Sequence, residues 1–160
     1  MKTAIYAGTF DPITNGHLSV LTSAARLFDH VIVGVAADNN KKTLFSLEER
    51  TKLAEESAAH LDNVTVKAFS GLLVDFAKEQ EATALIRGLR VVSDFEYEMQ
   101  MATFNKDLCH ELETVFFIAD AELSYISSSQ VRGIASLGGD VERYVTEEVA
   151  EALRRKYGNA

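Results

Sequence analysis

The segment from Gly8 to His17 holds the residues whose types and order best suit chemistry on a phosphate. An apolar run ends at Gly8, the chain turns through Pro12, the only proline, and an amphipathic helical pattern begins near Gly16. A strand, a turn and a helix N-terminus in this order aim free backbone N–H groups and the positive end of a helix dipole at one point, which suits an anion. Thr9 adds a hydroxyl, and His17 in the first helical turn can reach a bound phosphate. We therefore interpret His17 as catalytic, although a single helical histidine is more often structural.

Two further segments carry groups that bind phosphate. Ser127 to Ser129 precede a predicted helix; one serine would suffice as an N-cap, whereas three hydroxyls with the helical amides would bind a triphosphate. Arg87 and Arg90 flank Gly88 directly after an apolar strand pattern, and arginine forks match the geometry of phosphate oxygens. The alternative for these arginines is a pair of solvated loop residues.

These groups need a scaffold, and strand-like and helix-like patterns alternate along the whole chain. The predicted strands cover 3–7, 31–37, 63–69, 83–86 and 114–119, and the predicted helices cover 16–28, 46–60, 72–80, 93–109, 128–135 and 146–156. Strands separated by helices need crossover connections. The sequence therefore predicts an α/β fold, a single doubly wound Rossmann-like domain over 1–160 with a five-stranded parallel sheet and C-terminal helices.

Finer features of the pattern can also be tested. Apolar and polar residues alternate over 63–69, which predicts a strand at the edge of the sheet. Capping boxes at Ser46 with Glu49 and at Ser93 with Glu96 mark two helix starts. Ligands of such sheets bind at the carboxyl ends of the strands. The segments predicted at that end are 8–15, 38–45, 69–73, 87–92 and 120–129.

Composition excludes several classes of protein. Acidic residues outnumber Lys and Arg by 24 to 16, and the net charge of −8 argues against a nucleic-acid surface. No apolar run approaches the roughly 20 residues of a membrane span, and the N-terminus shows no signal-peptide pattern. Cys109 is the single cysteine, so no oxidising compartment is required and we expect a cytoplasmic protein. The carboxylates show no metal-ligand spacing, so any Mg²⁺ would be carried by the ligand's phosphates.

The string Thr14-Asn15-Gly16-His17 resembles the T/H-x-G-H signature of the nucleotidyltransferase superfamily. The longer pattern resembles one family in particular, the bacterial phosphopantetheine adenylyltransferases, in order and over essentially the whole chain. Ala7 departs from it, because proline is expected before the Gly-Thr-Phe-Asp-Pro string. The further matching segments are 41–42, 44–50, 86–90, 94–100 and 125–132.

This resemblance implies transfer of AMP from ATP to 4′-phosphopantetheine, giving dephospho-coenzyme A and pyrophosphate, with Mg²⁺ on the ATP phosphates. It also implies a homohexamer and coenzyme A as a possible inhibitor; apolar periodicity alone does not single out an interface. The implied catalytic residues are Thr9, His17, Lys41 and Arg90. The implied ATP-binding residues are Thr9, Phe10, His17, Gly88, Leu89, Arg90, Glu98, Leu123, Ser124, Tyr125, Ile126, Ser127, Ser128 and Ser129. The implied acceptor-binding residues are Thr9, Lys41, Leu73, Arg87 and Asn105.

Two alternatives stay open from the residues alone. The first is a related nucleotidyltransferase with another acceptor, such as nicotinate or nicotinamide mononucleotide, or one that uses CTP on a polyol phosphate. The second is a non-catalytic ATP sensor on the same fold, which would not need His17. Neither a Ser-His-Asp nor a Cys-His constellation is evident, so the sequence favours phosphate positioning over covalent catalysis.

Overall fold

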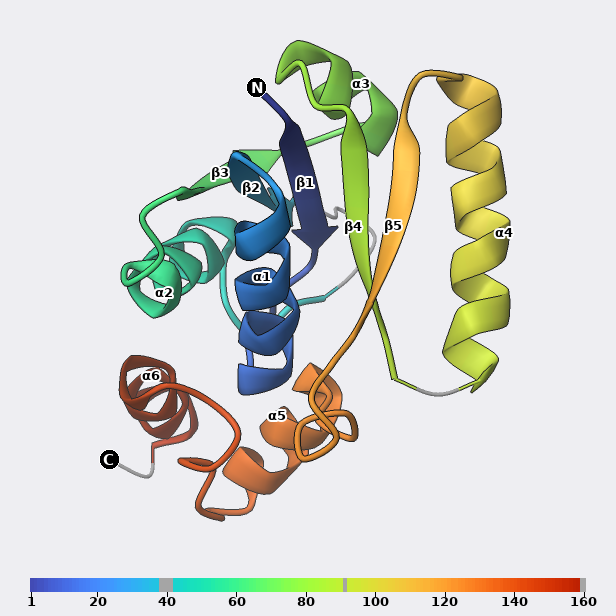
Figure 1. Ribbon diagram of the computed structural model, residues 1–160. Coiled ribbons are helices and arrows are strands. Elements are labelled where there is room, and N and C mark those ends of the chain that lie inside the picture. The colour runs from blue at the N-terminus through green and yellow to red at the C-terminus, as the bar shows by residue number, and fades with distance from the viewer. Residues whose placement is uncertain (38–41, 91, 159–160) are drawn as a thin grey trace.

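The computed structural model describes residues 1–37, 42–90 and 92–158, and it is built on one parallel β-sheet with strand order β3-β2-β1-β4-β5 (Figure 1). The strands are β1 (Thr3–Gly8), β2 (His30–Ala36), β3 (Val64–Phe69), β4 (Ala84–Leu89) and β5 (Glu113–Ile118). The helices are α1 (Asn15–Leu27), α2 (Leu47–Ala58), α3 (Leu73–Glu79), α4 (Val92–Leu108), α5 (Ser128–Ser136) and α6 (Glu147–Tyr157). Each predicted strand and helix is present, and the predicted doubly wound α/β class is confirmed.

Alternate side chains of the central strands enter two separate hydrophobic clusters. Ala4 and Tyr6 of β1 pack with α1, α2, α5 and α6, whereas Ile5 and Ala7 pack with α3. Helix α4 lies against β4 and β5 at the sheet edge (Figure 1). A strand buried on both faces must be apolar throughout, which explains the unbroken apolar runs of β1 and β2. At the opposite edge, β3 alternates between partly buried and exposed residues, which confirms the edge prediction.

The direction of the chain across the sheet reverses between β1 and β4. From β1 the chain steps outward to β2 and β3, and it then returns to form β4 and β5 on the other side of β1. At such a switch point the loops after neighbouring strands diverge and leave a crevice for ligands. Helices α5 and α6 lie beyond the carboxyl ends of the strands (Figure 1), so the C-terminal part of the chain closes this end of the sheet.

Most boundaries differ from the predictions by one or two residues, and two differences, at the end of β4 and the start of α4, bear on the site. Strand β4 runs to Leu89 rather than to 86, because its last residues pair with β5, including Gly88 with Phe117. Arg87 and Gly88 therefore lie on a strand and not in a loop. Helix α4 begins at Val92, so Ser93 lies inside the helix and is not its N-cap, contrary to the second predicted capping box.

The capping box at the start of α2 is confirmed. The Glu49 backbone N–H donates to the Ser46 hydroxyl at 3.1 Å, and the Ser46 N–H donates to the Glu49 carboxylate at 2.9 Å. None of the helices in the described ranges combines the length and apolarity that crossing a membrane requires.

Candidate active site

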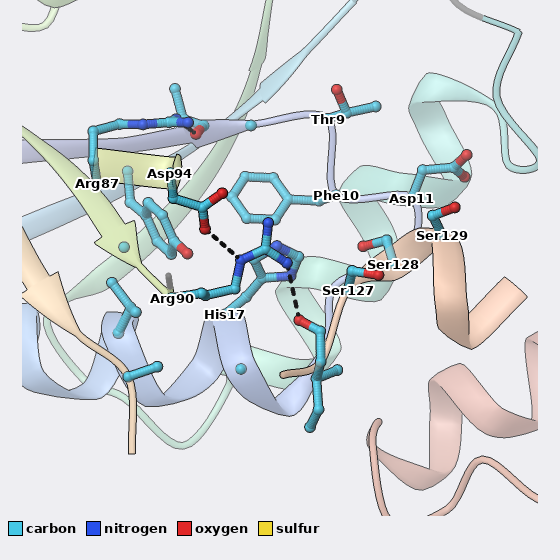
Figure 2. A pocket seen from close by; sticks show the side chains of 18 of the residues that line it. Thr9, Phe10, Asp11, His17, Arg87, Arg90, Asp94, Ser127, Ser128 and Ser129 are labelled. Atoms are coloured by element: carbon cyan, nitrogen blue, oxygen red, sulfur yellow. Dashed lines mark hydrogen bonds and ion pairs between the residues drawn. The ribbon is translucent and has the colours of Figure 1, made fainter. Parts of the chain in front are cut away.

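A cleft of about 730 Å³ opens at the switch point, where β1, β4, α1, α5 and the segment before α5 meet. Thr9, Phe10 and Asp11 form one wall, and Ser127, Ser128 and Ser129 lie beside them (Figure 2). His17 lies in the first turn of α1, and its side chain and that of Arg90 both line the cleft (Figure 2). Residues from three distant parts of the sequence thus line one cavity: 9–11 with 16–17, 87–88 with 90, and 127–129.

Two glycines allow the elements around this cleft to approach closely. A Cβ on Gly88 would lie 2.9 Å from Val20 Cγ2 on α1, and a Cβ on Gly16 would lie 3.2 Å from the Leu123 carbonyl oxygen. A side chain at either position would therefore push α1 away from β4 or from the segment that leads to α5, unless its neighbour shifted.

The imidazole of His17 is part of the N-terminal cap of α1. The His17 backbone N–H donates to Thr14 Oγ1 at 3.3 Å, and the Thr14 backbone N–H donates to His17 Nδ1 at 3.0 Å. A backbone N–H can only donate, so Nδ1 is the unprotonated nitrogen and the neutral ring carries its proton on Nε2. The cap turns Nδ1 toward Thr14, which leaves Nε2–H as the donor on the side of the ring away from the helix end.

The surroundings of His17 keep it neutral. Burial, with the positive charges of Arg90 and Arg87, lowers the pKa of His17 to about 4. The Phe10 ring meets the imidazole edge to face, with ring centres 4.9 Å apart. Phe10 has a φ of 49°, a left-handed conformation that is unusual for a residue other than glycine and that turns its ring under His17. A neutral imidazole in this place can donate a hydrogen bond to a phosphate without first taking up a proton.

Arg87 of β4 is paired with Glu98 of α4. Arg87 Nε and Nη2 donate to the two carboxylate oxygens at 2.7 and 2.8 Å, and Nη1 donates to the Ala7 carbonyl at 2.8 Å. Glu98 is only 7% exposed, so it does not lie on a solvated face of α4. Burial alone would lower the pKa of Arg87, but the hydrogen bonds and charge of Glu98 outweigh it and raise that pKa. Arg87 is therefore a positively charged side chain of β4 that is oriented by these hydrogen bonds, and its guanidinium lies beside the end of β1.

Arg90 and Asp94 form a second arginine–carboxylate pair, which is more exposed than the pair of Arg87 and Glu98. The Arg90 Nε donates to Asp94 at 3.1 Å, and Nη1 donates to the Ile126 carbonyl at 3.3 Å (Figure 2). The latter bond ties the end of β4 to the segment before α5. Asp94 was not among the residues expected at the site, because its position four residues after Arg90 becomes meaningful only once α4 is placed.

The three serines at the start of α5 have different roles. Ser127 is the N-cap, and its hydroxyl accepts from the Gln130 N–H at 3.1 Å. The Ser128 hydroxyl donates to the Pro12 carbonyl at 2.7 Å and so joins α5 to the β1–α1 turn. Ser129 is exposed and lines the cleft, and its hydroxyl makes no hydrogen bond to another described residue. Capping thus occupies one serine, as the sequence argument allowed.

A set of polar contacts around Asp11, Arg50 and Arg132 fixes one wall of the cleft, and sequence reasoning did not foresee these contacts. Asp11 accepts from the backbone N–H groups of Leu44 and Phe45 at 2.9 and 3.0 Å. Arg132 Nη1 donates to the Asp11 carbonyl at 2.6 Å and lies 3.7 Å from its carboxylate. Arg50 donates from Nη1 to the Thr9 and Ala36 carbonyls at 2.8 and 2.9 Å. No local pattern signals these contacts, since each joins residues far apart in the chain.

The remaining predicted site residues lie at different distances from the cleft. Leu123 and Ile126 line it, whereas Leu89 and Ser124 do not, and Tyr125 lines a neighbouring apolar groove. Leu73, at the start of α3, packs against the core cluster on the other face of the sheet. Asn105 lies about 20 Å along α4 from Val92, away from the cleft.

Lys41 lies outside the described residues. Its neighbour Lys42 is exposed and lines the cleft. Within 1–37, 42–90 and 92–158, no group of three or more His, Cys, Asp or Glu side chains could hold a metal ion.

Comparison with known proteins identifies the family. The model of the cytidylyltransferase-like family matches residues 5–134. A phosphopantetheine adenylyltransferase from Moorella thermoacetica is 58% identical over 158 residues, which is 99% of each chain. The chain belongs to the phosphopantetheine adenylyltransferase family. This membership confirms the resemblance inferred from the motifs at 14–17 and 125–132.

Solved structures of lower identity share the fold of this family member. One, described as a putative nicotinate-nucleotide adenylyltransferase from Vibrio parahaemolyticus, is 21% identical with a TM-score of 0.74, and the match covers 100% of this chain and 98% of the other. Another, described as a lipopolysaccharide core biosynthesis protein from Thermoplasma volcanium, is 23% identical with a TM-score of 0.57 over 75% of this chain and 98% of the other. At these sequence identities the similarity shows only that the fold is shared.

Proposed function

We propose that the chain transfers AMP from ATP to 4′-phosphopantetheine, giving dephospho-coenzyme A and pyrophosphate. The observation that carries the proposal is the cleft at the switch point, where a neutral His17 and the cationic Arg87 and Arg90 lie together. Membership of the phosphopantetheine adenylyltransferase family selects the acceptor. The arrangement suits a reaction in which two phosphates must be held in line.

The nucleophile in this mechanism is a 4′-phosphate oxygen, which is already anionic and needs no general base. It forms a bond to the α-phosphorus of ATP as the bond from that phosphorus to the bridging oxygen of pyrophosphate breaks. His17 donates its Nε2–H to a non-bridging α-phosphate oxygen, and Thr9 and Arg90 lie beside it as further donors. Donors fixed in advance toward developing negative charge lower the barrier without reorganising during the reaction.

The other site residues bind the two substrates. Arg87 and Lys41 hold the acceptor phosphate, and Leu73 and Asn105 contact the pantetheine arm. The nucleotide is held by residues 9–10, 88–90, 98 and 123–129, with Ser129 free to meet the triphosphate tail. Coenzyme A carries the same pantetheine arm as the acceptor, so we expect it to compete for this site as an inhibitor.

Mg²⁺ enters this proposal as part of the substrate. The described residues offer no cluster of ligands for a resident metal ion, and Mg²⁺ commonly binds through substrate phosphates and retained waters. In that position it neutralises charge on the departing pyrophosphate. The protein's contribution is to orient the triphosphate with the α5 N-terminus and the serines there.

The experiment is to measure pyrophosphate released from MgATP with each candidate acceptor. Release with 4′-phosphopantetheine, and much less with nicotinate or nicotinamide mononucleotide, is expected. Release with a mononucleotide but not with phosphopantetheine would contradict the acceptor assignment. ATP binding without pyrophosphate release in the presence of any acceptor would indicate a sensor instead of an enzyme. A further reaction with CTP and a polyol phosphate tests the remaining alternative.

We also propose that the single domain of residues 1–160 assembles as a homohexamer. Its outer helix α4 carries an exposed apolar stripe at helical spacing, consisting of Tyr97, Met101, Phe104 and Leu108. An apolar face of this kind on a small domain is typical of an interface. Light scattering after size exclusion measures the mass directly, and Phe104→Glu should yield smaller species. A wild-type monomer would contradict the assembly.

The single cysteine and the nature of the substrates support our proposal that the protein works in the cytoplasm. Fractionation of cells that produce the chain tests this directly, since recovery outside the cytoplasmic fraction would contradict it.

A further inference from the structure

The Arg87–Glu98 pair stands between the two substrate subsites. Arg87 comes from β4 and Glu98 from α4, and both side chains line the cleft. In the proposed function Arg87 holds the acceptor phosphate, whereas Glu98 contacts the nucleotide. The structure joins these two groups by two short hydrogen bonds, at 2.7 and 2.8 Å. One pair of side chains thus belongs to both subsites.

The pair retains bonding capacity on both sides. A guanidinium has five N–H donors, and the bonds to Glu98 and to the Ala7 carbonyl use three of Arg87's. The remaining N–H on each Nη can meet a phosphate oxygen. A carboxylate has about four lone-pair positions, so Glu98 can accept from a nucleotide hydroxyl or amine while it still holds Arg87. Both substrates can therefore bind without breaking the pair.

Burial of Glu98 keeps the pair together, while Arg87 retains some freedom of motion. Glu98 is 7% exposed, and a carboxylate this deep is poorly tolerated without its cation. The Arg87 side chain is one-third exposed, so part of its motion is still to be lost when a ligand binds. A ligand that immobilises either member orders the other, and a second ligand then meets a site that is already ordered.

We propose that the Arg87–Glu98 pair couples the binding of the two substrates. With the pair intact, each substrate binds more tightly in the presence of the other than it does when the pair is broken. This inference rests on the proposed function. The two substrates are both anionic and repel each other, which also contributes to the measured coupling. The contribution of the pair is therefore the change in the coupling factor when the Arg87–Glu98 pair is broken. Coupling between binding sites typically amounts to about 5–150-fold in affinity, and we expect the loss to fall in this range.

The experiment uses calorimetry with α,β-methylene ATP, in which the bond to be cleaved is blocked. The ratio of its Kd without and with saturating 4′-phosphopantetheine defines the coupling factor. Glu98→Gln replaces one accepting oxygen with a donor and should lower that factor at least about fivefold. Arg87→Lys breaks the two-point contact from the other side and should lower it likewise.

The matched control is Asp94→Asn, which breaks the neighbouring Arg90–Asp94 pair on the same helix. In the proposed function Arg90 contacts the nucleotide and not the acceptor, so this variant should change nucleotide affinity and leave the coupling factor within about twofold. A coupling factor in Glu98→Gln equal to that of the wild type would overturn the inference. So would an equal loss in Asp94→Asn.

Pyrophosphate release by the wild-type chain tests the proposed function separately. Release of pyrophosphate with an unchanged coupling factor in Glu98→Gln would overturn the coupling alone. A wild-type chain that does not bind phosphopantetheine would overturn both.

Discussion

Replacement of His17 by alanine is the sharpest test of the mechanism. In the structure Nε2–H is the donor available to the α-phosphate, because Nδ1 is held by the Thr14 N–H at 3.0 Å. Loss of one such preorganised donor typically reduces turnover by about 10²–10³-fold, or roughly 2.7–4 kcal/mol of transition-state stabilisation. The donor acts most strongly where charge develops, so ATP affinity should change far less than turnover.

The same substitution removes part of a helix cap and an aromatic contact. Loss of a cap costs about 0.5–2 kcal/mol of the free energy of unfolding, so the melting temperature should fall by several degrees without loss of the fold. His17→Gln is the matched variant, because its amide keeps an N–H donor at similar reach. It should retain more turnover than His17→Ala and more of the stability, because its amide oxygen can accept from the Thr14 N–H as in a capping box.

Three measurements together decide this prediction: steady-state pyrophosphate release at saturating substrates, calorimetry with α,β-methylene ATP, and thermal melting. If the affinity for the ATP analogue collapses in step with turnover, His17 anchors the ground state. If turnover in His17→Ala hardly changes, His17 is only a capping residue, and the reasoning from its tautomer and position is refuted.

Three other predictions concern the same cleft. Because the pKa of His17 is lowered from 6.5 to about 4, the pH profile of kcat/KM should show no inflection from His17 between these two pH values. In the same pH range His17 binds a proton in the unfolded chain but not in the folded chain, so the melting temperature of the wild type should fall more steeply than that of His17→Gln as the pH is lowered. Lys41→Ala and Arg87→Ala should each raise the apparent KM for phosphopantetheine by about 10–100-fold and change the affinity for ATP, measured without the acceptor, much less. Equal losses in these two quantities would mean that the acceptor pocket is misassigned. Ser127→Ala should lower the melting temperature by about 2–4 °C through loss of roughly 1 kcal/mol of capping, whereas Ser129→Ala should leave it unchanged and weaken ATP binding in calorimetry; the reverse pattern would contradict the roles assigned to the two serines.

Local sequence patterns predicted the elements well because their causes are local. The Ser46–Glu49 capping box and the alternation along β3 each depend on residues close in the chain. The end of β4 was placed too early, since Gly88 is a poor strand residue by itself and is held there by pairing with Phe117 of β5. That pairing is a tertiary contact, which no short window contains.

The sequence indicated that distant segments would meet at one end of the sheet, but it did not indicate the contacts between their side chains. Residues from each of the segments 9–17, 87–90 and 127–129 line one cleft. The cap formed by Thr14 and His17 was not foreseen, because the usual capping box has Glu or Gln in place of this histidine. The bond from Arg87 to Glu98 crosses from a strand to a helix, and its two partners had been assigned to separate ligands.

The contacts of Asp11 and Arg50 have a mechanical consequence. Asp11 holds the backbone of Leu44 and Phe45, and Arg50 holds the carbonyls of Thr9 and Ala36. The end of β1, the end of β2 and the backbone of Leu44 and Phe45 are therefore tied together, and we expect them to move as one unit. During thermal motion of this end of the sheet, the distance between a group held after β1 and a group held after β2 should vary less than the position of either group. An in-line reaction tolerates common drift of both reactants and is sensitive to changes in the gap between them, which these buried bonds restrain.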